Sequence, residues 1–219
     1  MPLIVRPMLE KDIVPAMTAQ YHAFRTSKGG KLLNPAPQPS SGYLSGSKES
    51  RLKAMKTNKN GRFMLVEDTD DNTVIACAHW DIYPDGLSAE RLEELCSKPD
   101  PPPDANQAYW KDFFGHFADS RRALGTRPIA ILFTIITAPE QQGRGAAKLL
   151  LKKFTEEVDE AAVEAYLEAS QVARPLYAKF GFEPDFEKTF DLSEYSSEVD
   201  GVDVNTVMLR PAKTGKASA

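Results

Sequence analysis

A continuous run of apolar and β-branched residues spans positions 129–137 (IAILFTIIT). Such a run predicts a strand that is buried on both faces. Downstream, Ala146, Leu150, Phe154 and Val158 recur every four residues, which predicts a helix with one apolar stripe. A short loop with two glycines separates the two segments. The order here is therefore buried strand, glycine loop and helix.

The N-terminal part of the chain alternates between short apolar segments and polar ones. Residues 3–6 predict a strand, and residues 12–24 predict a helix. We expect Asp12 to cap this helix, and Pro15 is tolerated in its first turn. Four apolar residues would share one face of the helix: Ile13, Met17, Tyr21 and Phe24.

The next segment, residues 26–46, is rich in Gly, Pro and Ser and so predicts a long loop. Loops of this length are usually functional or mobile. A short helix is predicted around residues 48–56. Residues 61–67 and 74–83 then predict two strands, and the polar turn DTDDN between them indicates a hairpin.

An unusual segment, residues 84–127, precedes the buried strand. It contains a predicted helix near residues 88–96, a run of prolines at 99–103 and a second predicted helix near 106–124. The proline run is typical of a stiff connector. The second helix carries five aromatic residues: Tyr109, Trp110, Phe113, Phe114 and Phe117. We interpret most of them as residues that dock the segment on the core.

The C-terminal third predicts further strands and one short helix. The helix covers residues 173–180, with Pro175 in its first turn and Gly181 as its C-terminal cap. The turn-rich sequence SSEVDGVD separates the last two strands. The expected strands are residues 165–169, 182–191 and 204–209.

The composition is that of a globular protein. The chain has 219 residues, of which 42% are hydrophobic and 26% charged, so we expect a single domain over residues 1–211 with residues 84–127 as a helical insertion. The last residues, 212–219, are small and basic and predict a disordered tail. A net charge of -4 gives no electrostatic reason to expect a nucleic-acid partner.

The remaining bulk properties indicate a cytoplasmic protein without a metal. Two cysteines, Cys77 and Cys96, fit a reducing compartment and lack the spacing of metal ligands, and the chain has only three histidines. Arg6 and Glu10 interrupt the N-terminal apolar residues too early for a signal peptide or a membrane span. We therefore expect no membrane partner.

The glycine loop is the strongest candidate for a binding site. Gly143 and Gly145 lie where the predicted helix begins. Free backbone N–H groups and the positive end of the helix dipole would then point to one place, which suits a phosphate.

Residues 142–147 (QGRGAA) resemble the pattern Q/R-x-x-G-x-G/A of the GNAT superfamily of N-acetyltransferases. Pro139 matches a proline common before that loop, and the sequence LYAKFGF near Tyr177 resembles a second landmark of the superfamily. The N-terminal IVRPMLEKDI is similar to its first strand and helix entry. The resemblance implies an α/β (α+β) fold: a mixed, mostly antiparallel sheet of about seven strands with flanking helices. Residues 84–127 would be an insertion between strands 3 and 4.

The resemblance also implies acetyl-CoA as co-substrate and no metal. In this superfamily the glycine loop wraps the pyrophosphate of coenzyme A, and the pantetheine arm pairs with the central strand. Ala147 departs from the more usual final glycine, which the pattern tolerates. The implied coenzyme A contacts are Ile135, Ile136, Thr137, Gln142, Gly143, Arg144, Gly145, Ala146, Ala147, Ser170 and Tyr177.

Acetyl transfer to an amine calls for a base and profits from an acid. By resemblance, Tyr177 protonates the leaving sulfur. The central strand lacks the Glu or His that many members carry, which leaves Glu168 or His79 with Asp81 as candidates. His79 and Asp81 would lie on the same face of their strand. A water chain, or an acceptor that is already neutral, would remove the need for a base.

The expected function is acetyl transfer to the amine of a small molecule, such as a xenobiotic or a secondary metabolite, by a monomer or homodimer. We expect one or two of Tyr109, Trp110, Phe113 and Phe114 to shape an apolar acceptor pocket. A peptide or protein N-acetyltransferase is one alternative. A catalytically idle acyl-CoA-binding module is another.

Overall fold

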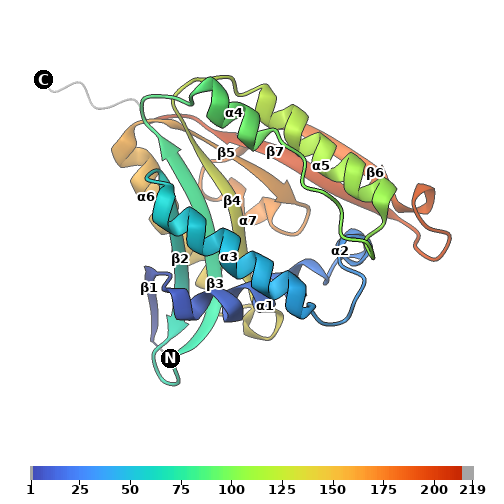
Figure 1. The fold of residues 1–219 in the computed structure, drawn as a ribbon. Helices are drawn as coiled ribbons and strands as arrows, with labels where there is room; N and C mark the ends of the chain where they lie inside the picture. Colours follow the sequence, from blue (N-terminus) through green and yellow to red (C-terminus); the bar gives the residue numbers. More distant parts are fainter. Residues whose placement is uncertain (1, 214–219) are drawn as a thin grey trace, which may run out of the picture.

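Seven strands form one mixed sheet in the computed structural model of the chain, which describes residues 2–213 (Figure 1). Their order across the sheet is β1-β2-β3-β4-β5-β7-β6. Only β4 and β5 run parallel, and all other neighbours are antiparallel. This confirms the predicted fold class. The strands are β1 Leu3–Pro7, β2 Gly61–Asp68, β3 Thr73–Tyr83, β4 Ile129–Thr137, β5 Glu164–Ser170, β6 Glu183–Asp191 and β7 Val202–Arg210.

Helices cover both faces of the sheet (Figure 1). On one face α6 packs against β2, β3 and β4, whereas α1, α3, α4 and α5 lie on the opposite face. The helices are α1 Ile13–Phe24, α2 Lys28–Leu33, α3 Ser41–Thr57, α4 Ala89–Leu95, α5 Gln107–Arg122, α6 Ala146–Ala161 and α7 Arg174–Ala178. Three short 3₁₀ helices complete the structure: η1 Glu10–Asp12, η2 Pro139–Gln141 and η3 Leu192–Glu194.

The apolar stripe predicted for the helix after the glycine loop is confirmed. All four of its residues in α6 are buried, and Phe154 packs against the fully buried Trp80 of β3 with ring centroids 5.5 Å apart. The Trp80 indole N–H donates to Glu157 at 3.1 Å, so its single polar group is satisfied as well. This core fixes the start of α6, and with it the glycine loop, against the sheet.

The prediction of a loop over residues 26–46 is wrong, because α2 and the start of α3 lie within it. Ser27 and Ser40 cap these helices by accepting the N–H groups of Gly30 and Tyr43 at 2.9 and 3.1 Å. A Cβ added at Gly29 would meet Asp203 and Tyr109 at 2.1 and 2.4 Å. Here glycine permits close packing of a helix instead of marking a loop.

Two details of the first helix also differ from the prediction. Asp12 does not cap α1 with its side chain: its carboxylate pairs with Arg6 at 2.6 Å and accepts the Leu9 N–H at 2.8 Å. Phe24 is 44% exposed and lies outside the buried face, which contains Ile13 and the other predicted residues. A strong salt-bridge partner thus outcompeted the local capping interaction.

The segment between β3 and β4 contains the two predicted helices, α4 and α5, and forms the expected helical insertion. In Figure 1, α5 runs along β6 and β7. The Tyr109 hydroxyl donates to Asp203 at 2.6 Å, and the Asn106 side chain donates to the Tyr195 carbonyl at 2.7 Å. The insertion is therefore docked on the C-terminal hairpin by specific polar contacts.

Other expectations concern the ends of the chain and the membrane. Residues 214–219, which make up most of the predicted tail, lie outside the described residues. Among residues 2–213, no helix has the length and apolar character that crossing a membrane requires.

Candidate active site

The parallel strands β4 and β5 separate halfway along their length. The register pairs Ile129 to Leu132 of β4 with Glu164 to Leu167 of β5 and then ends. From Phe133 onward β4 has no partner on this side, whereas β5 continues its pairing with β7. Main-chain groups of the second half of β4 can therefore pair with an extended ligand. The predicted pantetheine contacts Ile135, Ile136 and Thr137 all lie in this half.

A β-bulge marks the point where the strands separate. On β3, His79 pairs with Thr134 and Trp80 pairs with Leu132, so Phe133 has no partner in the register of either neighbouring strand. Bulges commonly re-aim backbone and side chains next to functional sites. This bulge places His79 directly across from the separating part of β4.

The glycine loop follows β4 and adopts the conformation that glycine permits. Gly143 and Gly145 have φ values of +80° and +84°, in the left-handed region. No side chain caps the start of α6, so the N–H groups of its first turn are not occupied by a cap. Arg144 points to the carboxylate of Asp68, with which it forms an ion pair, and donates to Gln141 at 2.5 Å. The loop is thus anchored to the end of β2.

His79 and Asp81 form a dyad on β3. The Nε2 atom of His79 lies 3.0 Å from Oδ1 of Asp81. Because the carboxylate accepts, Nε2 carries the proton and Nδ1 is left as the basic nitrogen. Nδ1 makes no hydrogen bond to a described residue and is not sealed from solvent. Burial lowers the pKa of His79, with Asp81 opposing the shift, so the imidazole is neutral at pH 7.

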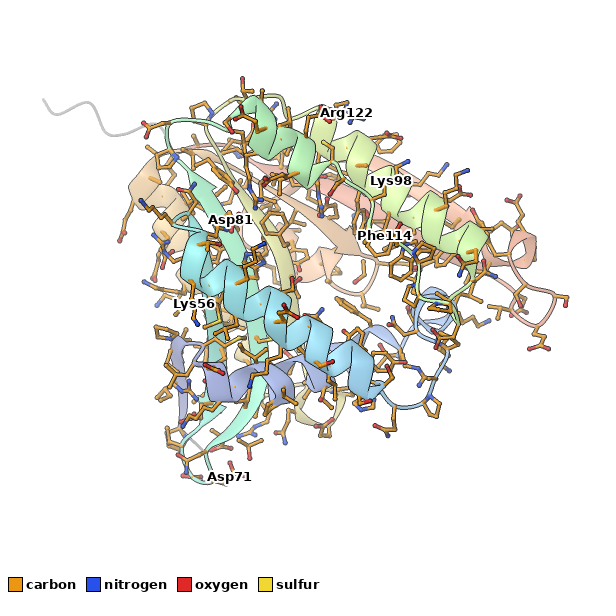
Figure 2. All side chains as sticks on the ribbon, in the orientation of Figure 1. Lys56, Asp71, Asp81, Lys98, Phe114 and Arg122 are labelled. Carbon is orange, nitrogen blue, oxygen red and sulfur yellow. The ribbon has the colours of Figure 1, made fainter. Side chains whose placement is uncertain are left out.

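Asp81 is completely buried and holds its position through four donors. Besides His79, these are the side-chain amide of Asn58 at 2.9 Å, the Tyr83 hydroxyl at 2.6 Å and Arg91 at 3.1 Å. Burial alone would raise the pKa of Asp81, but the hydrogen bonds outweigh it and lower the pKa to about 2. Figure 2 shows this residue near the C-terminal end of α3. A carboxylate held in this way fixes the tautomer and orientation of the imidazole.

Aromatic rings of three neighbouring strands stack in a row on this face of the sheet. The His79 ring lies between Phe63 of β2 and Phe133 of β4, with centroids 4.2 and 4.9 Å away. Arg51 of α3 covers the outer end at Phe63, and Arg121 of α5 covers the other end at Phe133, at 5.2 and 5.5 Å. We call these five residues the central row.

Glu168, the other candidate base, lies in a closed ion pair. Its carboxylate accepts from Arg121 at 2.7 and 3.2 Å and from the Tyr166 hydroxyl at 3.0 Å, and its side chain is only 2% exposed. Both oxygens are therefore already occupied. This arrangement suits a structural role between β5 and α5 better than proton transfer.

Tyr177 lies on α7 with 5% of its surface exposed and packs edge-on against Phe182. Burial raises its pKa, so the hydroxyl keeps its proton at any physiological pH. That hydroxyl has no partner among the described residues, yet it is not sealed from solvent. It is thus free to donate to a ligand. Ser170 lies at the exposed end of β5, beyond the point where β4 separates.

The aromatic residues of α5 divide into two groups. Tyr109 is fully buried, and Phe113 packs between it and Phe190, so these two dock the insertion. Trp110 and Phe114 pack together on a half-buried side of the helix, with tilted rings whose centroids are 4.4 Å apart, and Figure 2 shows Phe114 on the side toward α3. Phe117 continues this side to Arg121 of the central row, at 5.3 Å.

Sequence reasoning had not singled out Phe63, Phe133 or Arg51. Their common signal, stacking against His79, depends on the register of three strands and on the bulge at Phe133. The alternation of apolar and polar residues along a single strand predicts neither the register between strands nor the position of a bulge.

Comparisons with known proteins bear on the whole chain. The sequence model of the family described as "Acetyltransferase (GNAT) domain" matches residues 116–191. No protein of curated function matches the chain by sequence. Arylalkylamine N-acetyltransferase 2 from Aedes aegypti has a similar structure, with a TM-score of 0.67 and 14% identity over 96% of this chain and 99% of that one.

Two further solved structures are similar. The mosquito arylalkylamine N-acetyltransferase like 5b has a TM-score of 0.62 and 12% identity, over 95% of this chain and 99% of that one. A Corynebacterium glutamicum protein described as "histone acetyltransferase HPA2 and related acetyltransferase" has a TM-score of 0.58 and 20% identity, over 99% of this chain and 100% of that one. At such identities the likeness concerns the fold.

Proposed function

We propose that the chain is an N-acetyltransferase of the GNAT superfamily, whose sequence model matches residues 116–191, and that it transfers the acetyl group of acetyl-CoA to the amine of a small molecule. The observation that carries this proposal is the His79–Asp81 dyad beside the separating strands. It supplies a neutral base in the position where a thioester bound along β4 would meet an amine.

Acetyl-CoA fits the residues at the separation of β4 and β5. The unpaired half of β4 offers main-chain donors and acceptors to the pantetheine amides. The uncapped start of α6 and the left-handed Gly143 and Gly145 suit the pyrophosphate, because backbone can approach it without an intervening Cβ. No atom lies within 4 Å of a Cβ built at either glycine, which leaves room for such a ligand.

His79 acts as the general base in this proposal. An alkylammonium acceptor, with a pKa of about 10.4, must lose a proton before its nitrogen can attack the thioester carbonyl. Nδ1 of His79 accepts that proton, and Asp81 stabilises the imidazolium that forms. The central strand need not carry an acid, because its neighbour β3 carries the base.

The other groups serve the oxygen and the sulfur. As the nitrogen–carbon bond forms, negative charge develops on the carbonyl oxygen, and a main-chain N–H at the Phe133 bulge is suited to donate to it. The carbon–sulfur bond then breaks. Tyr177 donates its proton to the departing sulfur, whose pKa is about 8.5. The product is an amide and free coenzyme A.

Two features favour an acceptor whose amine is on a narrow, unbranched group. The His79 side chain is 18% exposed and lies between two rings, so only a narrow group can approach its nitrogen. The half-buried rings of Phe117 and Phe114 add apolar surface on the side of α5. The similar structures from mosquitoes are named for arylalkylamines, which agrees with such an acceptor.

Turnover with a panel of amines tests the proposal. Arylalkylamines and peptides with free N-termini would each be incubated with acetyl-CoA, and thiol release and acetylated product would be measured. We expect release with small amines and its loss in His79→Gln, whereas His22→Gln on α1 serves as a matched control. Preferential acetylation of peptides would favour the peptide alternative. Binding of acetyl-CoA without amine-dependent thiol release would favour the idle module.

A further inference from the structure

Arg51 of α3 is a half-buried cation without a carboxylate partner in the described part of the chain. Its guanidinium lies 5.2 Å above the Phe63 ring, and its only hydrogen-bond contact among the described residues is the Met17 sulfur at 3.8 Å. Four other buried or half-buried arginines each pair with a carboxylate: Arg6, Arg91, Arg121 and Arg210. The half-buried Arg25 instead donates to the main-chain carbonyls of Asn34 and Pro35, an alternative that Arg51 does not have in the described part of the chain.

The groups around Arg51 do not compensate its charge. The ionisable groups that act on it are Cys77 and Tyr43. Burial raises the pKa of Cys77 to about 12 and raises that of Tyr43 as well, so both are neutral at pH 7. Burial also lowers the pKa of Arg51, because it removes part of the solvation of the guanidinium. An uncompensated charge of this kind is costly unless a ligand supplies the counter-charge.

The position of Arg51 relates it to the reacting centre. It forms one end of the central row, and the next two rings are Phe63 and the base His79. At the other end Arg121 is already bound to both oxygens of Glu168. Of the two arginines that bound the row, Arg51 is therefore the one that can accept a further anion.

We propose that Arg51 binds a carboxylate of the acceptor, so that the preferred substrate is an arylalkylamine that also carries a carboxylate. This inference rests on the proposed function and specifies its acceptor. The amine lies at His79 and the apolar body lies along the central row. The carboxylate meets the guanidinium, whose planar donors match it in a bidentate manner.

The test compares amines in pairs, each carboxylated amine with its carboxylate-free analogue. Suitable probes are phenylalanine, para-(aminomethyl)benzoate and para-(aminomethyl)phenylacetate, which place the carboxylate at increasing distances from the nitrogen. We expect kcat/KM of at least one carboxylated amine to exceed that of its analogue by about 10- to 100-fold, as hydrogen bonds to charged groups generally allow. Equal use of all pairs overturns the inference.

Variants of Arg51 test whether this residue causes the preference for carboxylated amines. Arg51→Met keeps the length and removes the charge, so it should abolish the preference through KM of the carboxylated amine alone. Arg51→Lys should retain part of it. Arg62→Met is the matched control. Arg62 precedes Phe63 on β2, but it is exposed and pairs with Glu157. An equal loss for both members of a pair, or a weaker acetyl-CoA affinity, contradicts the inference.

A binding measurement separates this inference from the proposed function. Calorimetry would follow the preferred carboxylated probe with the wild-type protein and Arg51→Met, each saturated with coenzyme A. Binding that depends on Arg51 supports the anion site even if no amine is acetylated, in which case the proposed function alone fails. Binding that is equal in both proteins, or absent from both, overturns the inference. Unchanged melting temperatures would exclude misfolding as the cause.

Discussion

The imidazole of His79 donates from Nε2 to the buried carboxylate of Asp81 at 3.0 Å, which leaves its second nitrogen free. Both residues lie on β3, next to the central strand β4. The base proposed for acetyl transfer therefore comes from the neighbouring strand, and the absence of an acidic or histidine side chain from β4 does not exclude catalysis.

Replacing His79 by glutamine should lower kcat and leave acetyl-CoA affinity unchanged. General-base help is worth roughly 10²- to 10⁴-fold. Because burial lowers the pKa of His79, the wild-type rate should fall only below pH 6.5, where the imidazole becomes protonated. That acidic limb of kcat/KM should disappear in the variant. The measurement is kcat/KM as a function of pH for both proteins, with a weakly basic amine as acceptor. An acidic limb that is unchanged in His79→Gln would mean that another group titrates there.

Replacing Asp81 by asparagine should change the pH dependence of stability. The folded-state pKa of Asp81 is lowered to about 2, so its ionised form contributes stability above pH 3.8 that is lost as the pH falls towards 2. The difference in unfolding free energy between the wild type and Asp81→Asn should therefore narrow by about 2 kcal/mol over that interval. Urea unfolding measures it. Asp119→Asn, at an exposed position of α5, serves as the control variant.

Gly145→Glu should abolish coenzyme A binding while the protein still folds. The new carboxylate would oppose the phosphates, and the left-handed φ of +84° adds strain of about 1–2 kcal/mol. Gly125→Glu is a matched control, because Gly125 has a φ of +63° and, like Gly145, has no atom within 4 Å of an added Cβ. Calorimetry should show lost affinity in the first variant only. Equal affinity in both would remove the glycine loop from the coenzyme A site.

Tyr177→Phe should lower kcat by about 10²-fold, the low end of general-acid effects, because a thiolate is already a fair leaving group. Acetyl-CoA affinity should stay the same. Since burial raises the pKa of Tyr177, its ionisation should not limit the rate at alkaline pH. Tyr195→Phe, which removes a hydroxyl on the C-terminal hairpin, is the control. A fully active Tyr177→Phe would leave this residue with a packing role only.

Two aromatic residues of α5 should respond in opposite ways. Tyr109→Phe removes the partner of Asp203 and should destabilise the fold by about 2 kcal/mol without changing kinetics. Phe117→Ala, on the side of Arg121, should raise the amine KM about 2- to 10-fold with little loss of stability. Thermal unfolding and steady-state kinetics of both variants test this division. If Tyr109→Phe changes the amine KM and Phe117→Ala does not, the two roles are assigned the wrong way round.

Local patterns were sufficient for much of the fold. The spacing of Leu150 and Phe154 predicted the buried stripe of α6, and the apolar run predicted β4 with its observed ends. They failed in residues 26–46, where Gly29 and Gly30 looked like loop residues. Gly29 is required by its contacts with Tyr109 and Asp203, which are distant in sequence, and Gly30 by the close approach of the Phe24 carbonyl. Propensity describes what a residue permits, and tertiary packing decides how it is used.

The candidate site was predictable only in part. His79 and Asp81 could be placed on one face of a strand, because that needs only the two-residue period. Neither the bulge at Phe133 nor the stacking of three rings follows from that period, because both depend on how separate strands align. Arg51 reaches the site from a helix whose start was itself mispredicted, so its contact with Phe63 could not be anticipated.

Arg91 limits how the insertion between β3 and β4 can change without affecting the proposed base. Segments between strands are commonly regarded as modules that evolution or an engineer can exchange to obtain a new specificity. Here the insertion also contains Arg91, whose guanidinium donates to Asp81, the partner of the proposed base His79. A graft that replaced residues 84–127 without an equivalent cation would alter the acceptor surface and loosen His79 at once. A segment exchanged for a new acceptor specificity must therefore also supply a cation for Asp81, or the turnover rate will fall.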